Sequence, residues 1–282
     1  MTDPWLDVRI GDCREVLDTL PEQSVHCCVT SPPYWGLRDY GHDDQLGLES
    51  TPEQYVENMV DVCRKVRRVL RDDGTLWLNL GDCYGASKQL VGIPWRVAFA
   101  LQADGWYLRS DIIWAKPNPM PESVTDRPTK AHEYVFLLSK SPRYFYDADA
   151  VREGWADERC GAPGGTKPAE RNVGGRTDGL TRPSQAWTAP DGRTGRNRRT
   201  VWTVPTAPFP GAHFACFPPK LIEPCIMAGA PLGGMVLDPF LGSGTTGMVA
   251  EALGRQWFGI ELNPDYEPLI RERTKQLGLF GK

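Results

Sequence analysis

The chain has 282 residues, of which 40% are hydrophobic and 24% are charged, and its net charge is −4 at pH 7. This composition is ordinary for a soluble globular protein and leaves room for one large α/β domain with an insertion. Apolar runs such as residues 135–138 are far too short to span a bilayer, so we expect no membrane partner. The acidic start lacks an apolar core, which predicts no targeting segment and a cytoplasmic location. The negative charge argues mildly against a nucleic-acid partner, although its distribution matters more than its total.

Strand and helix signals alternate through the first half of the chain. Residues 25–30 predict a buried strand that stops at Pro32, because proline cannot continue a β-ladder. Pro52 opens a long helix with an apolar stripe at helical spacing. Asp73 and Gly74 are expected to break the chain before the next strand. We expect strands at residues 8–10, 25–30, 75–80, 107–114 and 134–138, and helices at 14–20, from 52 onward and at 93–103.

Regular structure returns after about residue 200. We expect a helix over 217–228, a buried strand over 235–238, a helix through 252, a strand over 257–261 and a final helix from 264. Strands that alternate with helices predict an α/β fold with a mostly parallel sheet and helices on both faces.

The stretch between these two halves differs in composition. Residues 152–200 are rich in Gly, Pro, Arg and Thr and show almost no periodicity. Residues 151–200 contain ten lysines and arginines against six aspartates and glutamates, so this stretch is positive while the remainder is negative. A solvated disordered insertion and a DNA-contacting segment are both compatible with this pattern, and Trp155 and Trp187 favour the second. We therefore expect a catalytic half at 1–151, a loop-rich target-recognition insertion at 152–200 and a cofactor-binding half at 201–282.

A glycine-rich turn follows the strand expected at 235–238. Gly242, Gly244 and Gly247 fit the G-x-G-x-x-G fingerprint of dinucleotide sites, and Glu261 lies near the expected place of a ribose-binding acid. Taken alone, this pattern predicts an NAD-dependent oxidoreductase equally well.

Asp238, just before this turn, separates the two cofactors. A carboxylate would repel a pyrophosphate at the helix N-terminus, whereas S-adenosylmethionine has no phosphate and carries an α-ammonium that an aspartate can pair with. The cofactor's carboxylate can take donors near Thr245 and Thr246, and its ribose hydroxyls suit Glu261. The loop lacks the lysine of a P-loop, and Ser243 lacks the flanking glycines of a nucleophile elbow. The sequence therefore predicts S-adenosyl-L-methionine as the cofactor.

The segment Ser31–Tyr34 reads Ser-Pro-Pro-Tyr and directly follows a buried strand. Its two prolines make a stiff extended segment without N–H donors, so its carbonyls stay available as acceptors. The exocyclic amine of cytosine or adenine is a poor nucleophile because its lone pair is delocalised into the ring. Hydrogen bonds from the amine to the Ser31 hydroxyl and the Pro32 carbonyl would localise that lone pair, and the Tyr34 ring can stack on a flipped base. The alternative is a strand-ending turn with an aromatic side chain packed beneath it.

Together, the two loops resemble the amino DNA methyltransferases of the β class, in which the catalytic loop precedes the cofactor loop. Residues 30–34 and 238–246 match that family in this order, and the resemblance covers about residues 8–150 and 200–275. It implies a Rossmann-like seven-stranded sheet with one antiparallel edge strand, flipping of a base out of double-stranded DNA, and a target-recognition segment between the halves. It is compatible with a monomer or a homodimer and with a cognate restriction endonuclease as partner.

Site residues carry over from this resemblance position by position. Residues 11–13 resemble the turn that contacts the cofactor's adenine, residues 213–218 the segment near its methionine end, and residues 114–118 a loop beside the target base. The expected cofactor-binding residues are Asp12, Cys13, Thr30, His213, Phe214, Phe217, Asp238, Pro239, Phe240, Gly242, Ser243, Gly244, Thr245, Thr246, Glu261 and Leu262. The expected catalytic residues are Ser31, Pro32, Pro33, Tyr34, Asn79 and Asp82. The expected DNA-binding residues are Trp114, Lys116, Asn118, Arg182, Arg193, Arg196, Arg198 and Arg199.

The identity of an assisting acid or base stays open. Asn79 stands where some relatives of the family carry an acid, and Asp82 is the nearest substitute. His132 and Glu133 do not form a zinc-protease motif, and we interpret them as a hydrogen-bonded junction between a loop and a strand. The eight cysteines contain no C-x-x-C pair, which indicates buried thiols in a reducing compartment rather than disulfides or a metal site.

The prediction of the target atom depends on Ser31. An aspartate there would be the stronger acceptor, whereas serine can accept from the amine and donate to an acceptor such as N3 of cytosine. Physical chemistry leaves N4 of cytosine and N6 of adenine open, and the resemblance favours N4 of cytosine because relatives with serine here are mostly cytosine enzymes. Three alternatives remain: an NAD-dependent oxidoreductase, a methyltransferase acting on RNA or a protein amide, and a catalytically silent DNA-binding module.

Overall fold

The computed structural model describes residues 7–39, 41–42, 45–153, 195–206 and 217–275. The chain divides into two units. The larger unit comprises residues 1–147 and 199–282, and the smaller comprises residues 148–198. All helices and strands of the described residues belong to the larger unit.

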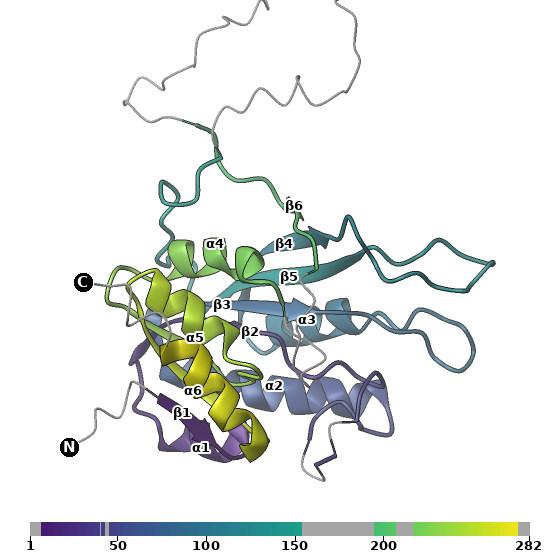
Figure 1. Cartoon of the computed structure of the whole chain (residues 1–282), viewed down its shortest axis with the longest axis horizontal. Helices are drawn as coiled ribbons and strands as arrows, with labels where there is room; N and C mark the ends of the chain where they lie inside the picture. Colours follow the sequence, from purple (N-terminus) through teal and green to yellow (C-terminus); the bar gives the residue numbers. More distant parts are fainter. Residues whose placement is uncertain (1–6, 40, 43–44, 154–194, 207–216, 276–282) are drawn as a thin grey trace, which may run out of the picture. The chain divides into compact units, whose positions relative to one another are not determined.

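The larger unit is built on one eight-stranded sheet with the order β1-β8-β7-β2-β3-β5-β4-β6 (Figure 1). Strand β5 runs antiparallel to both of its neighbours, and the other strands are parallel to one another. The strands are β1 (Asp7–Ile10), β2 (Val25–Thr30), β3 (Leu70–Leu80), β4 (Tyr107–Ala115), β5 (His132–Ser139), β6 (Val201–Thr203), β7 (Met235–Asp238) and β8 (Gln256–Glu261).

The helices begin at residues with clear start signals. The Thr51 side chain caps α2 by accepting from the backbone N–H of Gln54, and Pro52 fills the first helical position, where no N–H is needed. The helices are α1 (Cys13–Thr19), α2 (Pro52–Val69), α3 (Ile93–Ala103), α4 (Pro219–Gly229), α5 (Thr245–Ala252) and α6 (Glu267–Lys275), with a 3-10 turn η2 (Pro264–Tyr266) before α6.

The helices cover both faces of the sheet. Helices α1, α2 and α3 pack against one another in sequence, and so do α4, α5 and α6. Cys28 and Leu76 lie in the core beneath the first group, whereas Cys27 and Trp77 lie against Gly229 of α4. Neighbouring strand residues such as Cys27 and Cys28 thus point to opposite faces of the sheet. The structure thus confirms the expected α/β architecture.

Two details of the sheet differ from the expectation. The sheet has eight strands rather than seven, and the antiparallel strand β5 lies between β3 and β4 rather than at an edge. The extra strand β6 has three residues, of which only Trp202 is buried, so it lacks the apolar run that marks a strand in sequence. The position of β5 depends on pairings between distant segments, which periodicity does not reveal.

Strand β3 also begins earlier than expected. Leu70 already pairs with Val25, and Thr75 pairs with Cys27, so the register between β2 and β3 shifts between these pairs. Asp73 and Gly74 therefore lie within the irregular part of β3 and do not break it. A register shift lets a strand pass through residues that would otherwise end it.

The carboxyl ends of five parallel strands meet at one edge of the sheet. Strands β1, β8, β7, β2 and β3 are neighbours in this order and end at Ile10, Glu261, Asp238, Thr30 and Leu80. In open parallel sheets, ligands bind outside such an edge. The two loops singled out in the sequence thus follow neighbouring strands, β2 and β7, although they are far apart in the chain.

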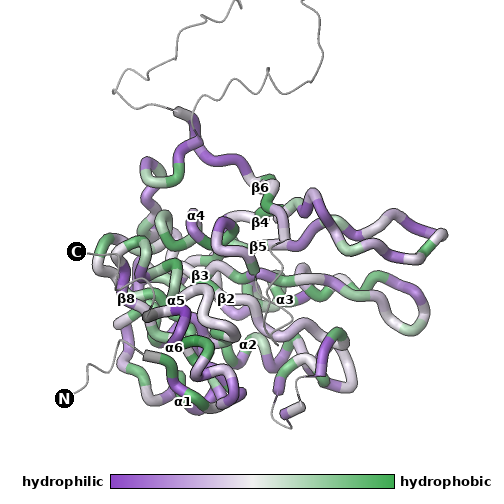
Figure 2. The backbone as a smooth tube through the Cα atoms, viewed as in Figure 1, coloured by the Kyte–Doolittle hydropathy of each residue, from purple (hydrophilic) through white to green (hydrophobic). Residues whose placement is uncertain are grey.

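The described residues of the smaller unit are its two ends, 148–153 and 195–198, which we call the neck. Glu153 and Arg196 form an antiparallel bridge with backbone hydrogen bonds of 3.0 and 2.9 Å and an ion pair of 3.0 Å. Figure 2 shows the neck as hydrophilic, in agreement with the run of polar residues at 195–200. The two ends of the insertion are therefore adjacent.

Candidate active site

Side chains join the ends of β2 and β7. Thr30 Oγ1 donates to Asp238 Oδ1 and Thr246 Oγ1 donates to Asp238 Oδ2, both at 2.6 Å. The backbone N–H of Phe240 also donates to Asp238 Oδ1, at 3.0 Å. Burial raises the pKa of the Asp238 carboxyl to about 6, although these hydrogen bonds oppose the rise. Asp238, which is 1% exposed, therefore holds β2, the glycine loop and the start of α5 together.

Glu261, at the end of β8, also connects neighbouring segments through its carboxylate. Its Oε2 accepts from the backbone N–H of Gly242 at 2.8 Å, and its Oε1 accepts from that of Asn263 at 2.9 Å. Its backbone carbonyl accepts from Gly11 N–H at 2.9 Å, which brings the turn after β1 alongside. Burial raises the pKa of Glu261 to about 7, because few water molecules reach its carboxylate.

The turn after β1 caps a helix. The Asp12 side chain accepts from the backbone N–H of Arg14 at 2.7 Å and forms an ion pair with the guanidinium of the same residue. Cys13 is buried, and burial raises the pKa of its thiol to about 12. Asp12 and Cys13 thus lie at the predicted edge, and the thiol stays protonated at neutral pH.

The glycine loop packs tightly against its surroundings. A Cβ on Gly247 would stand 2.8 Å from the Trp257 ring, so only glycine lets α5 approach β8 this closely. Arg273 of α6 donates to the backbone carbonyl of Ser243 at 2.7 Å. Buried members of the predicted cofactor set are Pro239, Ser243, Gly244, Thr245 and Thr246, and partly buried ones are Phe217, Phe240, Gly242 and Leu262.

A cluster of polar side chains lies just beyond the end of β2. The Ser31 hydroxyl donates to the Tyr34 hydroxyl at 3.2 Å, and the Tyr34 hydroxyl donates to Glu133 Oε2 at 2.7 Å. Asn79 Nδ2 donates to Ser31 Oγ at 3.3 Å and to Glu133 Oε2 at 2.9 Å, and it also contacts the Tyr34 hydroxyl. Lys116 Nζ forms an ion pair with Glu133 Oε1. The structure thus brings together four predicted residues and one that was not predicted as a site residue.

The unpredicted residue is Glu133 of β5. The sequence did indicate a hydrogen-bonded junction there, but it gave no partner. Asn79 pairs with Val135 across β3 and β5, so Glu133, two residues from Val135, lies on the same face as Asn79. Because Glu133 and Val135 are two residues apart, the sequence would have placed Glu133 on the face of Asn79 if the pairing of β3 with β5 had been known.

Asn79 also carries an unused acceptor. It is 3% exposed, and its Oδ1 is buried without a hydrogen-bond partner among the described residues. An unpaired buried acceptor is costly, and such groups in native proteins usually mark a ligand or water position. The site therefore offers an acceptor to an incoming N–H donor.

The Tyr34 ring is held from two sides. A Cβ on Gly81 would stand 2.5 Å from Tyr34 Cε2, so the ring lies directly on this glycine. The Tyr55 hydroxyl donates to the Pro33 carbonyl at 2.8 Å, which anchors the loop. Burial, and then the nearby Glu133 carboxylate, raise the pKa of Tyr34 well above its ordinary value. Tyr34 is therefore a neutral phenol at neutral pH.

Asp82 lies at a different place from the one the sequence suggested. Its Oδ1 accepts from the backbone N–H groups of Cys83, Gly92 and Ile93 at 2.9, 2.9 and 3.0 Å. Asp82 thus caps the start of α3 and makes no described contact with the Ser31 cluster. The carboxylate in that cluster belongs to Glu133 instead.

Three residues that were predicted to contact DNA make contacts within the protein. Trp114 is only 4% exposed and donates to the Val204 carbonyl at 2.8 Å, so its indole is not free to meet a base. Asn118 exchanges hydrogen bonds with Thr206 at 3.3 and 3.0 Å, and Lys116 pairs with Glu133. The contacts of Trp114, Asn118 and Lys116 are thus within the protein, and sequence alone did not show them.

Other predicted residues lie elsewhere. Arg182, Arg193, His213 and Phe214 fall outside the described residues. Arg196 pairs with Glu153 in the neck of the smaller unit, Arg198 is partly buried, and Arg199 is exposed.

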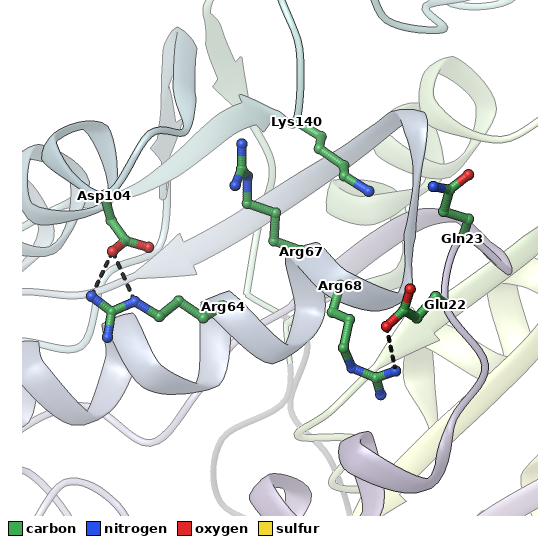
Figure 3. Close-up of a pocket in the computed structure, with 7 residues that line it drawn as sticks. All are labelled: Glu22, Gln23, Arg64, Arg67, Arg68, Asp104 and Lys140. Carbon is green, nitrogen blue, oxygen red and sulfur yellow. Dashed lines mark hydrogen bonds and ion pairs between the residues drawn. The ribbon is translucent and has the colours of Figure 1, made fainter.

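A hollow of about 330 Å³ lies at the opposite edge of the sheet (Figure 3). Its lining comes from segments before β2, β3 and β4 and after the antiparallel β5, namely Glu22, Gln23, Arg64, Arg67, Arg68, Asp104 and Lys140. Arg64 pairs with Asp104 there, and Arg68 with Glu22. Because these segments mark the amino edge of the parallel strands, this hollow is separate from the Ser31 cluster.

The described residues hold neither a metal-binding group nor a membrane span. They contain no group of three or more His, Cys, Asp or Glu side chains that could hold a metal ion. Within the same part of the chain, no helix is long and apolar enough to cross a membrane.

Comparison with known families identifies the chain. The family model for N6 and N4 methyltransferases, described as DNA methylase, matches residues 25–272. The chain belongs to this DNA methylase family. The methylase is 49% identical to the Type II methyltransferase M.Cfr9I of Citrobacter freundii, over 94% of this chain and 86% of the relative. It is 44% identical to the Type II methyltransferase M.SmaI of Serratia marcescens, over 94% and 89%.

Solved structures share the fold of this methylase. The PvuII DNA methyltransferase (cytosine-N4-specific) matches with a TM-score of 0.70 and 22% identity, over 94% of this chain and 85% of that one. The putative DNA modification methylase TTHA0409 of Thermus thermophilus, solved with S-adenosyl-L-methionine, matches with a TM-score of 0.66 and 26% identity, over 96% and 94%.

The cofactor of this methylase is S-adenosyl-L-methionine. The buried Asp238 carboxylate ends the strand directly before the glycine loop, where it disfavours a dinucleotide pyrophosphate. The oxidoreductase alternative is thereby set aside.

Proposed function

We propose that this methylase transfers a methyl group from S-adenosyl-L-methionine to the N4 amino group of cytosine in double-stranded DNA, at a specific sequence. The observation that carries the proposal is the hydrogen bond between Thr30 and Asp238. It joins the cofactor loop to the residue directly before Ser31, so a methyl donor in one loop stands beside amine acceptors in the other.

The carboxylate of Glu261 is proposed to accept from the ribose hydroxyls of the cofactor. Asp238 was expected to pair with the α-ammonium, but its oxygens already accept three hydrogen bonds in a site that is 1% exposed. We therefore propose that Asp238 mainly positions Thr30 and Thr246, and that the start of α5 receives the cofactor's carboxylate. When bound, the cofactor supplies a sulfonium methyl, which is already a good electrophile.

The amine is proposed to bind beside Ser31. One N–H would donate to Ser31 Oγ and the other to an acceptor such as the unpaired Asn79 Oδ1 or the Pro32 carbonyl. The Pro33 carbonyl already accepts from Tyr55, which leaves the preceding carbonyl as the candidate. Two such acceptors favour a pyramidal nitrogen whose lone pair can attack in line with the sulfonium methyl.

The target base must leave the DNA stack to reach this site. Base flipping exposes the exocyclic amine and lets an aromatic ring hold the base. Tyr34 is proposed to contribute to this holding, although its hydroxyl is already bound to Glu133. The choice of cytosine depends on Ser31, since at 22% identity the likeness to the PvuII enzyme supports the fold alone. The alternative target is N6 of adenine, which presents the same amine chemistry.

The insertion at 152–200 is proposed to recognise the DNA sequence. Residues 151–200 are positive in a negative chain, which suits phosphate contacts and guanine edges. Arg182, Arg193, Arg196, Arg198 and Arg199 are the proposed contacts. The Type II relatives suggest in addition a cognate restriction endonuclease, acting with a cytoplasmic monomer or homodimer of this methylase.

Modification-sensitive sequencing of DNA from cells that express the chain tests this proposal. We expect methylated cytosines within one short sequence in cells with the wild-type chain, and none in cells with the Ser31→Ala variant. Unmodified DNA from cells with well-folded wild-type protein would overturn the proposal. If RNA or a protein amide were methylated instead of DNA, the substrate would belong to another class than the one proposed.

A further inference from the structure

The cluster beyond β2 contains a hydrogen-bond chain with one direction. Ser31 Oγ–H donates to the Tyr34 oxygen at 3.2 Å, and Tyr34 O–H donates to Glu133 Oε2 at 2.7 Å. In both hydrogen bonds, therefore, the O–H group points toward the carboxylate. The chain begins at the side chain proposed to accept from the target amine and ends at the one carboxylate in contact with the cluster among the described residues.

The partners present fix this direction. The Glu133 carboxylate can only accept, so the Tyr34 hydroxyl donates to it and the Tyr34 oxygen accepts from Ser31, while Asn79 Nδ2 donates to Ser31 Oγ. Lys116 Nζ can only donate, and it holds the other oxygen of Glu133. The hydroxyl protons of Ser31 and Tyr34 are therefore left to point onward to Glu133.

We propose that Glu133 is a positioning residue that receives, through Tyr34 and Ser31, the proton that the target amine loses; this rests on the proposed function. In that reaction the C–N bond forms and the bond between sulfur and the methyl carbon breaks, with its electron pair left on sulfur. The amine nitrogen gives a proton to Ser31 Oγ, Ser31 gives its own to Tyr34, and Tyr34 gives its own to Glu133. One proton is lost and one carboxylate is protonated, so charge and atoms balance.

The surroundings of Glu133 suit such a role. Lys116 Nζ forms an ion pair with Glu133 Oε1, and its ammonium lies over the Trp114 ring, 4.3 Å from the ring centroid. Glu133 is shielded, with a side chain that is 15% exposed. A carboxylate in such a place does not easily exchange a proton directly with bulk water.

The other candidates in this part of the site do not fit the role. Asn79 carries an amide, which does not take up a proton at neutral pH. The Asp82 carboxylate is engaged by three backbone N–H groups at the start of α3 and makes no described contact with Ser31 or Tyr34. Glu133 thus supplies the acid or base function that the sequence left open.

The test compares single-turnover methylation by wild type with Glu133→Gln, Tyr34→Phe and the double variant. Glutamine keeps the size of Glu133 but cannot take up a proton, and phenylalanine keeps the Tyr34 ring. We expect each single variant to slow methyl transfer by about a hundred- to ten-thousand-fold. The double variant should be no slower than the slower single one, because both changes cut the same chain. Glu133→Asp should recover part of the rate.

Binding measurements separate this role from a structural one. Calorimetric affinity for S-adenosyl-L-methionine and the fluorescence of 2-aminopurine at the target position should stay near the wild-type values in all variants. Glu122→Gln, which changes another paired glutamate, should keep the wild-type rate. A folded Glu133→Gln or Tyr34→Phe variant with a near wild-type rate would overturn the proposal, and so would multiplicative effects in the double variant. A wild-type chain that methylates no DNA would instead refute the proposed function.

Discussion

Thr30 and Asp238 are 208 residues apart in the chain, and their side chains share a hydrogen bond of 2.6 Å. Thr30 ends the strand before the Ser-Pro-Pro-Tyr loop, and Asp238 ends the strand before the glycine loop. This bond makes the two loops one site, whatever their order in the chain.

Replacement of Thr30 by valine should therefore affect more than one loop. The hydroxyl would be lost with little change in shape, and a buried oxygen of Asp238 would lose a donor. We expect a decrease of about 1–3 kcal/mol in the free energy of unfolding and a weaker cofactor affinity. Denaturant unfolding and calorimetry measure the two effects. Thr203→Val on the exposed edge of β6 is the control and should change neither. Unchanged stability and affinity in Thr30→Val would contradict the account.

Replacement of Gly81 by alanine should displace Tyr34. The new Cβ would stand 2.5 Å from Tyr34 Cε2, which is too close for a side-chain contact, so the ring or the backbone must shift. We expect a loss of about 1–3 kcal/mol in stability from overpacking and a marked loss of methylation. Gly85→Ala is the matched control, because its Cβ would meet nothing closer than 3.8 Å. Equal activity of the two variants would show that the position of Tyr34 is unimportant.

The buried acids predict an effect of pH. Folding raises the pKa of Asp238 from 3.8 to about 6 and that of Glu261 from 4.5 to about 7, chiefly through burial. The folded state therefore binds these protons more tightly than the unfolded state. Hence the contribution of the two groups to the free energy of unfolding falls as pH rises between about 4 and 7.

Cofactor binding should show the opposite trend. A protonated Glu261 loses acceptor capacity for ribose hydroxyls, so affinity should increase as pH rises through about 7. Calorimetry at about pH 6.5, in buffers of different ionisation enthalpy, should detect proton release on binding, and Glu261→Gln should reduce it. Binding without proton release in the wild-type protein would contradict the assignment of Glu261.

The neck between Glu153 and Arg196 makes the insertion removable. Because the two residues are bridged side by side, a short Gly/Ser linker can replace residues 154–195 with the bridge kept. We expect unchanged cofactor affinity, since the described cofactor residues all lie in the larger unit, and loss of sequence-specific methylation. Methylation of the same site by the shortened protein would refute the role of the insertion in recognition.

Much of the fold could be predicted from local signals. Proline marks the start of α2, and the buried apolar run marks both bounds of β2, as the structure has them. The position of β5 and the short strand β6 could not be predicted, because they depend on which distant segments pair. The edge where the two loops meet followed from the parallel sheet alone.

The site was predictable where chemistry follows a motif. Asp238 and Glu261 end strands and Ser31 begins a loop, and the residue types of these segments suggest their ligands. Glu133 was missed as a site residue because its partners, Tyr34 and Asn79, lie on other strands or loops and only the tertiary structure joins them. Asp82 looked suitable because it is close to Asn79 in sequence, yet its carboxylate caps a helix.

The most direct test is the chemical identity of the product. Purified wild-type protein is incubated with double-stranded DNA and S-adenosyl-L-methionine that carries a deuterated methyl group, and the DNA is digested to nucleosides for mass spectrometry. The account predicts labelled N4-methylcytosine, which disappears in the Ser31→Ala variant. Labelled N6-methyladenine alone would refute the choice of cytosine and keep the amine chemistry. A methyl group on carbon 5 of cytosine would contradict the account, because that reaction needs a covalent nucleophile and this loop has no cysteine.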